Sequence, residues 1–181
     1  MNILAVDTTG EALSVALRAG EKVFAVHRVF ARPHDETLLP AADKLLVKAG
    51  LKLADLDAVA AANGPGRFTG IRIGMAYAAV AARCAGKPAL AITRFEALAH
   101  GRSEKKFCAV LAGFRGEKYH QVFPGGEPSW SPDLPAGVPV VESEPTAVDL
   151  LGPAERLLKG KKLPKFEPLY LKPAGYERLK K

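Results

Sequence analysis

The sequence predicts an α/β protein in which a mixed, five-stranded sheet is flanked by helices. Three observations support this fold class. Residues 1–30 contain one apolar run and two runs that alternate between apolar and polar side chains, and the breaks between these runs are short. From residue 38 the apolar positions follow a helical period, and a glycine-rich turn at 63–66 then joins an apolar run to a second helical segment. Hairpins that feed into alternating helices and strands are typical of a mixed sheet covered by helices.

Three strands are expected at the N-terminus. Residues 3–6 form an apolar run of buried-strand character, whereas residues 12–18 and 22–30 alternate. Because the connections between these runs are so short, the strands must pair antiparallel as hairpins.

Helices and strands alternate after Pro33. Gly50 closes the first helix, and Gly86 with Pro88 closes the second, for which Thr69 is the expected N-cap. The expected elements are a helix at 38–49, a strand at 57–62, a helix from Thr69 to about Cys84, a strand at 88–93 and a short helix at 95–100.

The second half of the chain predicts a smaller, loop-rich unit. We therefore expect an N-terminal lobe at 1–100 and a reduced second lobe at 101–181. The second lobe would hold strands at 107–111 and 118–123, a proline-rich stretch without regular structure at 124–145, a short helix at 154–158, and a tail at 165–181 that can pack back on the first lobe.

Small residues line one face of the helix that begins near Thr69. Gly70, Gly74, Ala78 and Ala82 follow one another at intervals of four and therefore share a face. A helix face without bulky side chains lets another backbone come close, either that of the chain's own sheet or that of a second protein. We expect a dimer contact here, in which Gly74→Leu would abolish dimerisation and leave the fold intact.

Composition favours a protein of the reducing cytoplasm that does not enter the membrane. Cys84 and Cys108 lie in apolar segments, where we expect buried thiols. The chain opens without a basic region, so we expect no signal peptide. Its longest apolar run, around residues 75–82, is far shorter than a bilayer span.

Positive charge is concentrated at the end of the chain. The net charge is +7, and residues 155–181 hold nine Lys or Arg against three Glu, which is +6 of that total. Such a tail is either a solvated end of the chain or a weak electrostatic binding site for nucleic acid. The lysines that would recruit RNA are Lys159, Lys161, Lys162 and Lys165.

Residue patterns for hydrolytic chemistry are weak. His27, His34, His100 and His120 are each isolated in the sequence, and His34 with Asp35 and Glu36 suits the start of a helix. We expect no metal site, no nucleophile elbow and no cleft with two acidic walls.

Three segments carry a resemblance to a known family. Residues 3–11, which contain the Asp7-Thr8-Thr9 turn, residues 34–40 and the glycine segment 64–74 resemble the TsaB (YeaZ-like) family, and the resemblance resumes at 168–172. This family is part of the glycoprotease-like branch of the actin/hexokinase/Hsp70 superfamily. The resemblance therefore implies an actin-like ATPase (RNase H-like) fold.

The resemblance also implies a function. Members of this family are non-catalytic, dimerising subunits that support a TsaD-like catalytic subunit and a TsaE-like ATPase in N6-threonylcarbamoylation of adenosine 37 of tRNA. We expect a homodimer when the chain is alone, no cofactor, and only a vestigial phosphate turn at Asp7, Thr8 and Thr9. Gly113-Phe114-Arg115 stands where relatives often have Asp-Ala-Arg, which argues further against nucleotide hydrolysis. The alternative is a stand-alone ATP-dependent enzyme or a glycoprotease-like hydrolase.

The two helices of the first lobe are the expected partner interface. Arg67 lies in the exposed glycine turn, and Leu39 and Leu46 make the apolar stripe of the first helix broader than one sheet face requires. The predicted interface residues are Leu39, Leu46, Arg67, Phe68, Gly70, Ile71, Gly74, Met75 and Ala78.

Overall fold

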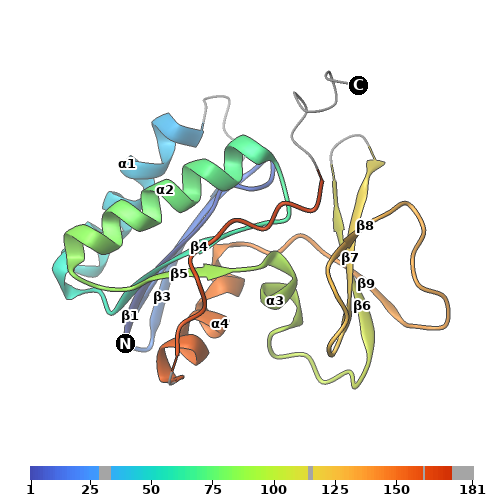
Figure 1. Cartoon of the computed structure of the whole chain (residues 1–181). Helices are drawn as coiled ribbons and strands as arrows, with labels where there is room; N and C mark the ends of the chain where they lie inside the picture. The colour runs from blue at the N-terminus through green and yellow to red at the C-terminus, as the bar shows by residue number, and fades with distance from the viewer. Residues whose placement is uncertain (29–33, 114–115, 161, 173–181) are drawn as a thin grey trace.

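The computed structural model describes residues 1–28, 34–113, 116–160 and 162–172. Phe30, Phe114, Arg115, Lys161 and the residues after Lys172 therefore lie outside the described residues. Two sheets form two lobes side by side, with the larger at the N-terminus (Figure 1). No helix in the described ranges is long and apolar enough to cross a membrane.

The first lobe contains the predicted mixed, five-stranded sheet, in the order β3-β2-β1-β4-β5. The hairpin strands pair antiparallel, as predicted, and β1 pairs with β4, and β4 with β5, in parallel. The strands are β1 (Asn2–Asp7), β2 (Leu13–Ala19), β3 (Lys22–Arg28), β4 (Ala58–Ala62) and β5 (Ala89–Ile92), and a 3-10 turn η1 (Leu53–Asp55) precedes β4.

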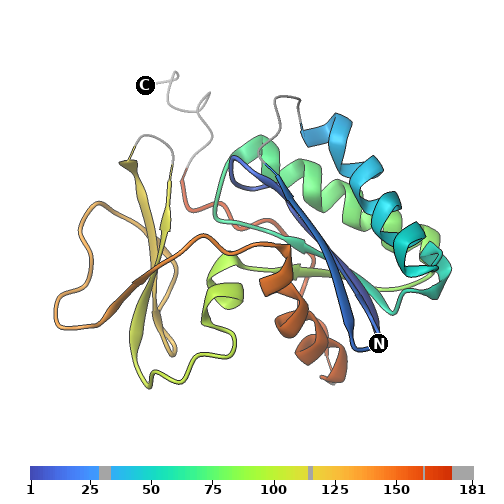
Figure 2. The same cartoon turned by 180° about the vertical axis from the view of Figure 1, so that it is seen from behind.

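Helices cover both faces of this sheet. The helices α1 (His34–Ala49) and α2 (Phe68–Ala85) lie side by side on one face, and α4 (Ala147–Lys159) covers the other (Figures 1 and 2). Although α4 comes late in the sequence, its Leu150 and Leu151 pack against β1 residue Ile3 in the first lobe. The two halves of the chain are therefore interleaved.

The second lobe is a four-stranded sheet in the order β8-β7-β6-β9. It holds the two expected strands, β6 (Phe107–Ala112) and β7 (Lys118–Phe123), and α3 (Arg94–Ala99) packs against β6. The stretch 124–145 was predicted to lack regular structure, which is wrong. It contributes β8 (Ser129–Trp130) and β9 (Val140–Glu142) to the edges of the sheet.

The last helix is longer than the sequence indicated. α4 begins at Ala147, not at Ala154, because Thr146 and Asp149 form a reciprocal capping box. Gly152 and Pro153, which usually weaken a helix, lie inside it.

The boundaries of α2 also differ slightly from the prediction. Arg67 is the N-cap residue and makes no side-chain cap hydrogen bond, so Thr69 lies inside the helix. At the other end Gly86 takes the left-handed conformation with φ of 65°, as expected for a glycine just past a helix.

The small-residue face of α2 packs against the chain itself. A Cβ atom on Gly74 would lie 2.6 Å from the Thr8 Oγ1 atom, and one on Gly70 would collide with the Thr8 carbonyl oxygen. Thr8 Oγ1 in turn donates a 2.6 Å hydrogen bond to the Gly70 carbonyl. The close contact expected from these glycines is therefore intramolecular, and Gly74→Leu should destabilise the fold and not merely separate two subunits.

The C-terminal segment crosses from one lobe to the other. Leu169 donates its backbone N–H to the Asn63 carbonyl at 2.8 Å, and the Tyr170 ring lies 4.8 Å from the Phe68 ring. Phe166 packs on the first-lobe core, whereas Leu171 packs on the core of the second lobe.

Candidate functional site

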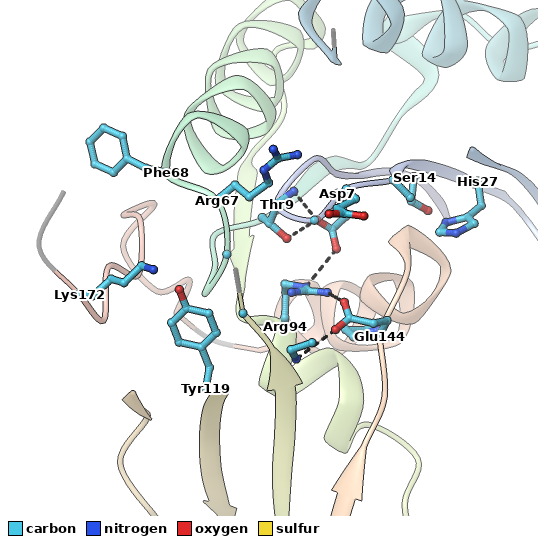
Figure 3. A pocket seen from close by; sticks show the side chains of 17 residues that line it. Asp7, Thr9, Ser14, His27, Arg67, Phe68, Arg94, Tyr119, Glu144 and Lys172 are labelled. Atoms are coloured by element: carbon cyan, nitrogen blue, oxygen red, sulfur yellow. Dashed lines mark hydrogen bonds and ion pairs between the residues drawn. The ribbon is translucent and has the colours of Figure 1, made fainter. Parts of the chain in front are cut away.

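A cavity of about 670 Å³ lies between the two lobes (Figure 3). Residues from the turn after β1, the start of α2, the start of α3 and the second-lobe sheet line it. Its charged lining residues are Asp7, Glu11 and Glu144, which are acidic, and Arg67, Arg94 and Lys172, which are basic.

The Asp7-Thr8-Thr9 turn forms one wall, and its polar atoms are already bonded within the chain. The Asp7 Oδ1 atom accepts hydrogen bonds from the Thr9 backbone N–H at 2.8 Å and from the Thr9 hydroxyl at 2.6 Å. The Thr8 hydroxyl donates to Gly70, and all three side chains are buried. These groups satisfy local donors and acceptors, which is the structural role that such a turn can have without a phosphate.

Arg94 is the central residue of the cavity. Only 3% of this residue is exposed, and its guanidinium lies between the acidic side chains of the two lobes (Figure 3). Its Nε atom is 3.6 Å from Asp7 Oδ2, and its Nη2 atom donates to Glu144. A third contact, from Nη1 to the Pro65 carbonyl at 3.4 Å, ties Arg94 to the glycine turn.

Glu144 completes this connection on the second lobe. Besides its bond with Arg94, it accepts a 3.2 Å hydrogen bond from the Ala112 backbone N–H at the end of β6. A cleft with two acidic walls does exist, contrary to the prediction from sequence, since Asp7 and Glu144 face it from opposite lobes. The buried guanidinium pairs with both carboxylates and thereby joins the lobes.

Lys172 closes the cavity from the C-terminal segment. It forms an ion pair with Glu117, and its Nζ atom lies 5.9 Å from the centre of the Tyr119 ring. Burial lowers the pKa of Lys172, but the hydrogen bond to Glu117 and the neighbouring Tyr119 outweigh it, so the pKa is raised overall. Figure 3 shows the Tyr119 hydroxyl pointing toward Lys172.

The predicted interface residues fall into three groups. Gly70, Ile71, Gly74, Met75 and Ala78 are buried in the first lobe, as is Leu46 with 5% exposure, so these residues are not on the surface in this structure. Arg67 and Phe68 line the interlobe cavity, where Phe68 lies beneath the Arg72 guanidinium. Leu39 is on the outer surface of α1, with 56% exposure.

One other expectation, that of two buried thiols, is wrong. Cys84 is exposed at the end of α2, and only Cys108 is buried. Of the lysines in the basic tail, Lys159 pairs with Glu155 and Lys165 with Glu167. These two lysines are therefore partly neutralised within the chain.

Sequence reasoning missed Arg94, Glu144 and Lys172. One signal could have located Arg94, because Thr93 and Glu96 form a capping box that fixes Arg94 as the first residue of α3. No pattern in the sequence indicated that Glu144, in the proline-rich stretch, would reach it. His34 was correctly expected at the start of α1, and its ring contacts the carbonyl oxygens of Thr8 and Glu11.

Comparisons with known proteins agree with the fold. Residues 26–123 match the family model described as "TsaD: tRNA N6-adenosine threonylcarbamoyltransferase". The Escherichia coli (strain K12) tRNA threonylcarbamoyladenosine biosynthesis protein TsaB is 36% identical over 123 residues, which is 66% of this chain and 53% of that protein. The chain belongs to the family that this model describes, and within it to the TsaB (YeaZ-like) proteins.

Two further similarities support this TsaB-like assignment. The TsaB protein of Haemophilus influenzae is 39% identical over 105 residues, 58% of this chain and 44% of that one. The structure of YeaZ from Pseudomonas aeruginosa superposes with a TM-score of 0.80 at 26% identity, over 94% of this chain and 99% of that chain. The TsaB-like chain spans about half the length of the curated relatives it matches.

Proposed function

We propose that this TsaB-like chain is a non-catalytic subunit of the machinery that makes threonylcarbamoyladenosine at position 37 of tRNA. It would support a TsaD-like catalytic subunit, together with a TsaE-like ATPase, and form a homodimer when alone. The names of the matching relatives place them in this biosynthesis. The basic tail would give the complex a weak contact with tRNA.

The Arg94 ion pairs are the observation that supports the non-catalytic role. Phosphoryl transfer needs free carboxylates and donors that position a metal ion and phosphate oxygens. Here Arg94 engages both Asp7 and Glu144, and the Thr8 and Thr9 hydroxyls donate to groups within the chain. The cavity is thus held together by its own charges.

The outer face of α1 and α2 fits the partner contact better than the small-residue face does. Three large apolar side chains are exposed there, namely Leu39, Val47 with 80% exposure and Val80 with 63% exposure. Apolar side chains grouped on adjacent helices are typical of protein–protein contacts.

Co-purification tests this proposal. The chain, co-expressed with a TsaD-like subunit, should be recovered in a complex, and tRNA modification by the reconstituted complex should depend on it. The double variant Val47→Asp/Val80→Asp should lose the complex while the chain stays folded. Val140→Asp is the control, because Val140 is also exposed but lies on β9 of the second lobe. Assembly that is equally strong in all variants would contradict this interface.

A thermal shift measurement separates the scaffold from a stand-alone ATPase. A ligand at one hundred times its dissociation constant stabilises a protein by about 2.7 kcal/mol. We expect ATP with magnesium to leave the melting temperature of the isolated chain unchanged. ATP turnover by the pure chain that disappears in Asp7→Ala would instead support the enzyme.

A further inference from the structure

A second hollow, of about 420 Å³, lies on the side of the first lobe covered by α4. Arg18 of β2, His100 at the end of α3, and Gly152, Glu155, Arg156 and Lys159 of α4 line it. We call it the basic hollow. Its lining brings together three elements that are far apart in the sequence.

The charges of the basic hollow are not balanced within the chain. Two cations share its single carboxylate, Glu155. Lys159 Nζ lies 2.7 Å from Glu155 Oε1, and Arg18 Nη1 lies 3.6 Å from Glu155 Oε2. The hydrogen bond from Lys159 lowers the pKa of Glu155, which therefore stays ionised near neutral pH. Arg156 is exposed and has no hydrogen-bond or ion-pair partner among the described residues. Positive charge is thus left over at the hollow.

Arg18 has an unfilled donor. Its Nε atom is buried from solvent and has no acceptor within the described part of the chain. A guanidinium has five N–H donors, and a buried donor without a partner costs free energy. The Arg94 Nε atom of the interlobe cavity is in the same state, so the surplus of positive charge, and not the unfilled donor, distinguishes the hollow.

The position of His100 depends on a glycine inside a helix. A Cβ atom on Gly152 would overlap the His100 ring at its Nε2 and Cδ2 atoms. Glycine costs about 1 kcal/mol relative to alanine inside a helix. Basic residues in the last turn of a helix can merely complement its dipole, as Arg156 and Lys159 would. Complementing the helix dipole does not explain why α4 has a glycine at the position that the His100 ring contacts.

Further basic residues follow His100 and α4 in the sequence. Arg102, Lys105 and Lys106 follow His100 in an exposed loop that contains one acidic residue, Glu104. Lys162 is exposed just beyond α4. A net positive pocket with further exposed cations on the adjoining segments suits a polyanion with repeated phosphates better than a single small anion.

We propose that the basic hollow binds a backbone phosphate of RNA, and that the chain thereby contacts the tRNA substrate directly. The guanidinium groups of Arg18 and Arg156 donate to the phosphate oxygens, which suit their planar array of N–H groups. The contact reads charge and shape, not base sequence. This inference rests on the proposed function for the identity of the RNA.

The test measures tRNA affinity across a salt series. Fluorescence anisotropy of a labelled, unmodified tRNA transcript is recorded with the wild-type chain, Arg156→Gln and His100→Gln. We expect Arg156→Gln to weaken binding about fivefold and to reduce the log–log salt slope by about 0.7–0.9, the contribution of one phosphate contact. His100→Gln should weaken binding less, because glutamine still donates a hydrogen bond.

Arg83→Gln is the matched control. Arg83 is exposed in the last turn of α2, as Arg156 is in the last turn of α4, and it has no described partner either. Arg83→Gln should leave affinity and salt slope unchanged, and both variants should keep the wild-type unfolding midpoint. Equal losses in the two variants would mean unspecific charge attraction and overturn the proposal.

Two further measurements identify the occupant and separate this inference from the proposed function. If Arg156→Gln weakens binding to vesicles rich in anionic phospholipid but not to tRNA, the hollow binds lipid and the RNA proposal is wrong. Co-purification with the TsaD-like subunit is measured in parallel. Failure of the wild-type chain to assemble rejects the proposed function. An assembled complex in which Arg156→Gln keeps full tRNA affinity rejects only the RNA contact at the hollow.

Discussion

The two hollows of this molecule differ in how their charges are balanced. The interlobe cavity has three acidic and three basic lining residues, and its most buried cation, Arg94, bonds to carboxylates from both lobes. The basic hollow has three cations and one carboxylate, with Arg156 unpaired among the described residues. Both are concave and both contain arginine, but only the first balances its cations with an equal number of carboxylates, because Arg18 and Lys159 share Glu155 and Arg156 has no described partner.

This difference separates a structural role from a binding role. A buried cation held between two carboxylates fixes the relative position of the segments that carry them. An excess of positive charge instead favours an external anion. Cavity size alone would favour the interlobe cavity as the binding site, because it is the larger of the two. Its charged groups, however, already pair with one another.

The largest expected effect comes from breaking the interlobe ion pairs. Arg94→Met removes the charge but keeps much of the side-chain volume, so Asp7 stays buried without its cation. Loss of one partner from a buried pair costs about 3–5 kcal/mol, and we expect the free energy of unfolding to fall by that amount. Urea denaturation followed by circular dichroism measures it.

Arg102→Met is the control for this prediction. Arg102 forms an ion pair with Glu104 at 3.4 Å, but both side chains are partly exposed, and such pairs contribute about 1 kcal/mol or less. The double variant Asp7→Asn/Arg94→Met should recover part of the stability lost in Arg94→Met. If Arg94→Met costs no more than Arg102→Met, the interlobe ion pairs do not hold the lobes together.

The first-lobe fold could be predicted because its signals are local. Periodicity and hairpin lengths indicated β1 to β5, α1 and α2, and the structure confirms the mixed sheet. The short strands β8 and β9 have two and three residues, too few for a period to show. Gly152 and Pro153 hid the start of α4, since both residues usually interrupt helices.

The candidate site was only partly predictable for a different reason. Asp7 and the two threonines stand out because a polar turn follows a buried strand. Arg94, Glu144 and Lys172 meet across elements whose relative position depends on the packing of both lobes. The same limit applies to the glycine face of α2, where the spacing predicted a close contact but could not show that its partner is Thr8.

The next prediction compares one substitution at two helical glycines. Gly70→Ala should lower the free energy of unfolding by about 1–3 kcal/mol, because the new methyl group meets the backbone of Thr8, which cannot move aside. Gly152→Ala meets only the ring of the exposed His100, and it should raise stability by up to about 1 kcal/mol through helix propensity. By displacing His100, it should also weaken tRNA binding. Similar stability losses in both variants would show that His100 is as firmly held as Thr8.

The smallest effect concerns Lys172, the cation that closes the interlobe cavity. Its folded-state pKa is raised above the ordinary value of 10.5, so protonated Lys172 favours the folded state. The stability it contributes is complete below the ordinary pKa and is lost as pH rises through the folded-state pKa. The contribution of this partly exposed pair with Glu117 should be about 1 kcal/mol or less.

Denaturation of wild type and Lys172→Met from pH 7 to pH 11 tests this effect. The difference in unfolding free energy between the two proteins should stay constant up to about pH 10 and shrink above it. Lys118→Met is the control, because Lys118 forms a more exposed pair with Glu142 at 3.4 Å and should differ little from wild type. A difference that stays constant through pH 11 would mean that Lys172 stabilises the cavity through its apolar stem and not through its charge. In that case the charge balance that distinguishes the cavity from the basic hollow would depend on Arg94 and Arg67.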